Sequence, residues 1–278
     1  MNIIQKFPRE YVIKNDKIKF NIENIKPKPE DYDEKNDLCN LSNWIYKFDR
    51  NYRNFTISKY DVEWLIKAHQ LYQTNNKFSE IYKDETDDFI KYYSKLLPNN
   101  FFKKKYFVRA EGVSLKYGIH GIGPYTSMKQ IVESIISSPY YHSCLKENEE
   151  CKIYLFHWIE DLSFFLEFRI FIFNNKITAI SQQHLYKSNL ILKNYSTLEF
   201  SILIDKIKIY FENNLKNKLF YLNSYTIDLS FIEDEPYCID VNPFGAYYSA
   251  AGSSLFHWID DKNLLCNDDD MIYFRYTE

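Results

Sequence analysis

Two carboxylates and an amide near the carboxyl end are spaced to hold a metal ion. Asp228 and Asp240 are equally far from Asp234, within a stretch that reads as strand, acidic turn and strand. A hairpin folded about Asp234 would place the two aspartates directly opposite each other, with Asn242 on the same face. Such oxygen donors suit a hard cation such as Mg²⁺, whose remaining ligands are often phosphate oxygens. The alternative is a hairpin whose acids face water.

A second predicted hairpin lies upstream, with strands over residues 164–173 and 176–183 joined by Asn174 and Asn175. A two-residue loop gives the pairs Phe173 with Lys176, Arg169 with Ile180, and Glu167 with Gln182. One face of this hairpin is then apolar and the other carries Glu167, Arg169 and Gln182. The polar face is either exposed to solvent or the floor of a cleft.

Four of the six glycines fall between Gly112 and Gly123, and Arg109 and Lys116 flank or lie within this loop. Backbone N–H groups in such a loop can approach phosphate oxygens, and the two cations could neutralise them. The spacing matches neither a P-loop nor a dinucleotide fingerprint. A flexible surface loop is the alternative interpretation.

Several regular elements must position these residues. Helical periodicity and caps predict helices at residues 58–73, 86–97, 127–137 and 197–214, and further strands at 106–109 and 153–158. Helices combined with antiparallel-rich strands predict a mixed α+β chain. We expect a helix-rich N-terminal lobe over residues 1–105 and a nucleotide-binding region over 106–278.

Composition narrows the function classes. The chain has 278 residues, 45% hydrophobic residues and a formal net charge of −3, which favours neither a nucleic-acid binder nor an anionic-membrane binder. The five scattered cysteines predict neither a disulfide framework nor a zinc site. No apolar run approaches a membrane span or a signal peptide, so we expect a cytoplasmic protein.

In order along residues 105–261, these motifs resemble the cell-division-cycle-123 family of the ATP-grasp superfamily. Arg109 and Lys116 keep the spacing of two family lysines, with arginine at the first position. The segments that carry the rest of the resemblance are Ile153–Trp158, Glu167–Ile172, Ala179–Gln182, Thr226–Leu229, Ile239–Phe244 and Leu255–Trp258. The first of these lacks the two basic residues of the family strand.

The resemblance implies an ATP-grasp-like fold in which two α+β lobes hold Mg²⁺·ATP. By it, Asp228, Asp240 and Asn242 carry the metal. The residues implied to contact ATP are Arg109, Lys116, His157, Trp158, Glu167, Arg169 and Gln182. Of these, Arg109, Lys116 and Arg169 would neutralise the phosphates, and the strand over residues 153–159 would line the adenine pocket. Read without the resemblance, His157 in its apolar run is more typical of a core residue.

The resemblance supports two functions of different class. Members of this family are assembly factors for translation initiation factor 2 that act on its gamma subunit, so the first is ATP-dependent binding of such a protein partner. The second is an ATP-grasp ligase, which joins a carboxylate to an amine through an acyl phosphate. No nucleophile signature is present, and none is needed for such a ligase.

Overall fold

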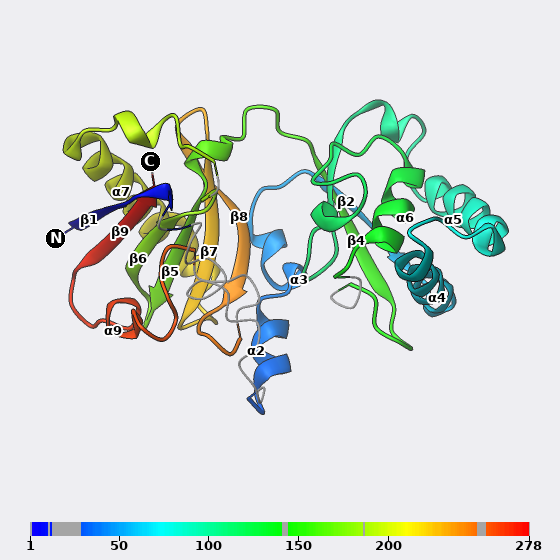
Figure 1. The fold of residues 1–278 in the computed structure, drawn as a ribbon, viewed down its shortest axis with the longest axis horizontal. Helices are drawn as coiled ribbons and strands as arrows, with labels where there is room; N and C mark the ends of the chain where they lie inside the picture. Colours follow the sequence, from blue (N-terminus) through cyan, green and yellow to red (C-terminus); the bar gives the residue numbers. More distant parts are fainter. Residues whose placement is uncertain are drawn as a thin grey trace. The chain divides into compact units, whose positions relative to one another are not determined.

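The computed structural model describes residues 2–10, 12, 29–140, 144–185, 187–248 and 254–277. The chain divides into two compact units (Figure 1). Unit 1 combines Met1–Trp44 with Asp161–Glu278, and unit 2 is Ile45–Glu160. The sequence-based division at residue 105 falls inside unit 2, just before strand β3.

Unit 1 is built on a six-stranded sheet with the order β1-β9-β6-β5-β7-β8. Its strands are β1 (Asn2–Phe7), β5 (Phe168–Phe173), β6 (Lys176–Gln182), β7 (Tyr225–Ile232), β8 (Glu235–Pro243) and β9 (Ile272–Thr277). In the part of the sheet formed by β6, β5, β7 and β8, each strand is antiparallel to its neighbour, whereas β9 runs parallel to both β1 and β6. Figure 1 shows β1 beside β9, so the two ends of the chain share one sheet.

The helices of unit 1 are short except for one. They are α2 (Tyr32–Leu38), α3 (Leu41–Trp44), α7 (Thr197–Tyr210), α8 (Lys216–Lys218) and α9 (Lys262–Leu265), with a π-helical turn at Phe211–Leu215 and 3₁₀ turns η7 (Phe164–Leu166) and η8 (Leu192–Asn194). Helix α7 begins with a capping box, in which Ser196 and Glu199 satisfy each other's backbone N–H groups.

The two faces of this sheet differ in character. Phe168, Ile170 and Ile227 are at most 2% exposed, and Phe200 of α7 contacts Phe274 with ring centroids 5.3 Å apart, so α7 covers the apolar face. The opposite face carries Arg169 and Asp228 and, further along the strands, the buried Phe171, which packs against Phe256 and Trp258. We call this opposite face the acid face, because it holds Asp228 and Asp240.

A β-bulge changes the register predicted for the β5–β6 hairpin. Phe173 pairs with Lys176 as predicted, but Arg169 pairs with Ser181 and Gln182 with Phe168, so the other two predicted pairs are wrong. The register shifts next to Phe171. Thr178 is the extra residue there, and its hydroxyl donates to the Leu265 carbonyl at 2.8 Å. The extra residue transfers every later β6 side chain to the other face.

Unit 2 packs three helices on a smaller antiparallel sheet of order β2-β4-β3. Its elements are β2 (Tyr52–Ile57), β3 (Tyr106–Arg109), β4 (Cys151–His157), α4 (Lys59–Asn75), α5 (Lys83–Lys95) and α6 (Met128–Ser137), with 3₁₀ turns η2 (Ile45–Lys47), η3 (Glu80–Tyr82), η4 (Phe101–Lys103) and η5 (Leu115–Tyr117). Its core includes the fully buried residues Val62, Leu65 and Ile131 from the helices and Ile153 and Leu155 from β4.

The predicted α+β class is confirmed, and both units combine helices with a sheet. Ser58, Ser127 and Ser196 cap the helices predicted to start near them. No helix within the described ranges is both long and apolar enough to cross a membrane.

Candidate functional site

The predicted opposition of the two aspartates is confirmed: Asp228 on β7 is the register partner of Asp240 on β8. Two local features together produce this pairing. The turn is only two residues long, and both Glu233 and Asp234 adopt positive φ, as type I′ hairpin turns require. A bulge next to Leu229 then shifts the register by one residue, which brings Asp240 opposite Asp228.

Asp228 is held by a buried arginine. Arg169, 3% exposed, donates from Nε to Oδ1 of Asp228 at 2.8 Å and from Nη2 to Oδ2 at 2.7 Å. Burial alone would lower the pKa of the guanidinium, but the charge of Asp228 and these two hydrogen bonds raise it above its ordinary value. Asp240 and Glu167 add smaller attractions to Arg169. The predicted phosphate role of Arg169 stays a prediction, since this carboxylate partner does not test it.

Gln183 is a member of the cluster that the sequence analysis missed. Its Nε2 donates to Oδ1 of Asp228 at 2.6 Å, and its Oε1 accepts from the Ser254 hydroxyl at 3.1 Å. Regular alternation of side chains along β6 predicted that Gln182 would lie on the same face as Arg169. The bulge at Thr178 reverses that alternation, and no pattern in the sequence signals the bulge.

Asn242 supplies the third predicted metal-binding side chain on the acid face, where Thr226 is its register partner. Among the residues that the structure describes, the buried Nδ2 of Asn242 and the buried hydroxyl of Thr226 have no hydrogen-bond partner. A buried polar group without a partner costs about 1–3 kcal/mol, so a water, an ion or another polar ligand that supplied hydrogen bonds to these two groups would be stabilised here.

The charge and the donor chemistry of this cluster fit Mg²⁺. Three carboxylates, Asp228, Asp240 and Glu167, attract the Arg169 guanidinium, so these four groups together carry a formal charge of −2. The oxygen donors are hard, as Mg²⁺ requires. Within the described ranges no three His, Cys, Asp or Glu side chains are grouped to hold a metal, and the predicted set indeed contains only two acids, with an amide as its third member.

Glu167 and Gln182 lie at the end of the β5–β6 hairpin but serve different contacts. Glu167 Oε2 lies 2.9 Å from Nε2 of His184, whose ring stacks on Phe164 with centroids 3.4 Å apart. Gln182 is 1% exposed and ties two strands together, because its Oε1 accepts from the Thr277 backbone N–H at 3.0 Å. The structure therefore places Glu167 near the acid cluster and Gln182 at the strand ends, and the cofactor contacts predicted for both stay predictions.

The remaining predicted cofactor contacts belong to unit 2. Arg109 is 4% exposed and donates from Nε to the Ala110 carbonyl at 3.3 Å, while the exposed Lys116 has its Nζ 5.2 Å from the centre of the Tyr117 ring. His157 stands edge-on to Tyr106 with ring centroids 5.3 Å apart. Burial, together with the charges of Lys104 and Arg53, lowers the pKa of His157.

Trp158, the other residue expected at the adenine, donates from Nε1 to Glu160 at 3.1 Å. The cofactor roles of Arg109, Lys116, His157 and Trp158 all stay predictions, because none of these contacts tests them.

The glycine-rich loop is anchored to α6. A Cβ on Gly118 would lie 2.4 Å from the Ser134 carbonyl oxygen, so only glycine allows this approach. The N–H of Ile119 donates to the Ser137 hydroxyl at 2.8 Å, and the Gly121 N–H donates to Gly118 O at 2.9 Å. Close packing on α6 explains why position 118 is a glycine. The N–H groups of Ile119 and Gly121 already have hydrogen-bond partners within the loop and α6.

Comparison with known proteins adds a family model described as D123, which matches residues 130–278, just over half of the chain. No curated protein sequence matches the chain. Among solved structures, Cdc123 from Schizosaccharomyces pombe is similar with a TM-score of 0.59 and 15% identity, covering 87% of this chain and 97% of that chain. Its C-terminally truncated form gives 0.59 and 16%, covering 87% and 98%. At such identities the likeness establishes a shared fold.

Proposed function

This chain belongs to the D123 (Cdc123) family, and on that premise we propose that it binds Mg²⁺·ATP at the acid face of the unit 1 sheet. Membership of this family agrees with the resemblance that the sequence motifs indicated. The single observation that carries the proposal is the pairing of Asp228 with Asp240, next to the unsatisfied Nδ2 of Asn242.

Each residue of the cluster has a distinct part in this proposal. Asp228, Asp240 and Asn242 would hold the metal, which when bound neutralises phosphate charge. Arg169 and Gln183 fix the Asp228 carboxylate from two sides, so that its orientation does not depend on the ligand. The side-chain Nδ2 of Asn242 and the hydroxyl of Thr226, which have no hydrogen-bond partner among the described residues, could donate to phosphate oxygens.

The test is calorimetry of ATP binding with and without Mg²⁺. Asp240→Ala should abolish Mg²⁺-dependent ATP binding and leave the circular dichroism unchanged, because Asp240 is partly exposed and its deletion leaves the Arg169–Asp228 pair intact. Asp205→Ala, which removes an exposed acid of α7, is the matched control and should bind as the wild type. Unaltered binding by Asp240→Ala would remove this carboxylate from the site.

A phosphate role for Lys116 has its own test. Lys116→Ala should weaken the binding of ATP more than the binding of AMP, because only ATP carries the β- and γ-phosphates. Lys129→Ala, which removes a lysine of α6 with a 69% exposed side chain, is the control. An equal loss for ATP and AMP would contradict the phosphate role.

We further propose that ATP binding serves a protein partner, the gamma subunit of translation initiation factor 2, in the cytoplasm. The support is family membership, and the ligase function remains the alternative. Purified protein should retain the gamma subunit in a pull-down only with ATP and Mg²⁺, and Asp240→Ala should lose it. Formation of ADP with a carboxylate and an amine, independent of the gamma subunit, would favour the ligase instead.

A further inference from the structure

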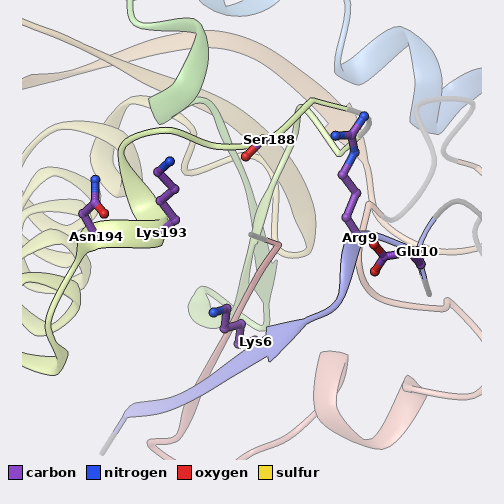
Figure 2. A pocket seen from close by; sticks show the side chains of 6 residues that line it. All are labelled: Lys6, Arg9, Glu10, Ser188, Lys193 and Asn194. Atoms are coloured by element: carbon purple, nitrogen blue, oxygen red, sulfur yellow. The ribbon is translucent and has the colours of Figure 1, made fainter.

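Unit 1 contains a basic cavity of about 680 Å³ that the nucleotide proposal does not use. It is lined by Lys6, Arg9, Glu10, Ser188, Lys193 and Asn194. Figure 2 shows these residues on two walls: β1 and the residues after it form one, and the segment 188–194 forms the other. Three cations and one carboxylate give the cavity a formal charge of +2, in a chain whose net charge is −3.

We propose that this cavity binds a phosphomonoester, a ligand distinct from the nucleotide at the acid face. A phosphomonoester is close to a dianion at neutral pH and offers three acceptor oxygens. The cavity offers matching donors in two ammonium groups, a guanidinium, a hydroxyl and an amide. A carboxylate ligand would neutralise only half of this charge.

Lys6 on one wall and the 188–194 segment on the other are held by contacts within the protein. Lys6 stands on a strand that pairs with β9 along its whole length. On the other wall, Asn189 is 1% exposed, donates to the Phe165 carbonyl at 2.8 Å and accepts from the Leu192 N–H at 2.9 Å. The N–H of Lys193 also donates to Asn189 O at 3.3 Å, so the turn that presents Lys193 and Asn194 is anchored in the core.

The cavity opens on the other side of the sheet from the acid cluster. Gln5 on β1 accepts from Nε of Arg275 at 2.8 Å, and Arg275 is the register partner of Ser181, which in turn pairs with Arg169. Gln5 is therefore on the acid face. Successive strand residues point to opposite faces, so the adjacent Lys6 is on the α7 side. Binding in the cavity should therefore not require the metal-binding residues.

The size of the cavity indicates more than a bare phosphate ion. Sites for small organic ligands are typically about 300–1,000 Å³, and this cavity falls within that range. Glu10 adds an acceptor that would repel a second anionic group but could bind a hydroxyl or amine of the ligand. The ester is therefore either a small metabolite or a phosphorylated side chain of another protein.

The experiment is calorimetry of the full chain with O-phosphoserine, serine, and a capped peptide with and without phosphoserine. Lys193→Gln should weaken O-phosphoserine binding about tenfold, as expected for one charge-assisted hydrogen bond, and Lys6→Gln/Lys193→Gln should weaken it further. Lys208→Gln removes the same charge from an exposed position of α7 and should have no effect. Asp240→Ala should also bind O-phosphoserine as the wild type does.

The outcomes separate the two sources and can overturn the proposal. A phosphopeptide that binds more tightly than O-phosphoserine identifies a phosphorylated protein as the source, and the reverse order identifies a metabolite. Three results would each refute a phosphomonoester site here. They are the absence of O-phosphoserine binding, equal binding of serine and O-phosphoserine, and an equal loss of O-phosphoserine affinity in Lys193→Gln and Lys208→Gln. Lys6 and Lys193 are exposed, so circular dichroism of their variants should match the wild type.

Discussion

The ion pair between Arg169 and Asp228 makes a sharp prediction about stability. Arg169→Met leaves a carboxylate without its cation, and Asp228→Leu leaves a guanidinium that is 3% exposed without its anion. Removing one partner of a buried pair costs about 3–5 kcal/mol, because the remaining charge stays buried and uncompensated. Each single variant should therefore lose about that much from the free energy of unfolding of unit 1.

The double variant Arg169→Met/Asp228→Leu should cost less than either single variant, because it leaves neither charge of the pair buried without its partner. The two residues would then show a coupling energy of at least about 3 kcal/mol in a double-mutant cycle. The assay is urea unfolding at pH 7, followed by circular dichroism and tryptophan fluorescence. Lys216→Met, which breaks the exposed pair with Glu212, should cost less than about 0.5 kcal/mol.

An additive cycle would refute the reasoning, because two side chains that stabilise each other cannot have independent effects. Single variants that cost no more than Lys216→Met would refute the buried character of the pair. The prediction also decides how the nucleotide proposal should be tested. Loss of ATP binding in an Asp228 variant would combine a metal effect with a folding effect, which is why Asp240→Ala is the variant of choice.

Three further predictions concern single positions. Ser196→Ala should cost about 1 kcal/mol of stability in urea, because it removes the cap of α7; an unchanged midpoint would contradict the capping box. Gly118→Ala should cost about 1–3 kcal/mol, since its Cβ would lie 2.4 Å from Ser134 O; tolerance of alanine would mean that the loop is not fixed on α6. Burial and the nearby cations lower the pKa of His157 below that of the unfolded chain, which binds its proton near pH 6.5. Unit 2 should therefore be most stable above that pH and lose stability as the pH falls through it, and His157→Gln should flatten this dependence in urea melts from pH 7.5 to 5.5.

The acid cluster was predictable to the extent that it depends on a local hairpin. Asp228, Asp240 and Asn242 share a short segment, and equal spacing about Asp234 was enough to predict that the two aspartates face each other, although the two-residue turn reaches this register only through the bulge next to Leu229. Gln183 was not predictable, because its position depends on the bulge at Thr178, and that bulge is stabilised by a contact with Leu265, nearly ninety residues away. The helices with serine caps were predicted well because their signals are also local in the sequence.

The strands β1, β2 and β9 were missed, although they complete the two sheets. Their partners are distant in sequence, and the short segments have no turn or alternation that identifies them: Tyr52–Ile57 pairs with β4 a hundred residues later. The charge of the basic cavity was also hidden, because Lys6 and Lys193 are ordinary surface residues until the sheet brings them together. Long-range pairing thus limited the prediction of fold and site alike.

The pairing of β1 with β9 has a consequence for the order of events during synthesis. Asn2 is the register partner of Ile272, so the first strand is made 270 residues before its neighbour. Unit 2 is continuous and has all its residues once Glu160 is made, and compact units generally fold as wholes during translation. The N-terminal strand must therefore wait as an unpaired edge, available to chaperones and to misassociation, while the rest of the chain is translated.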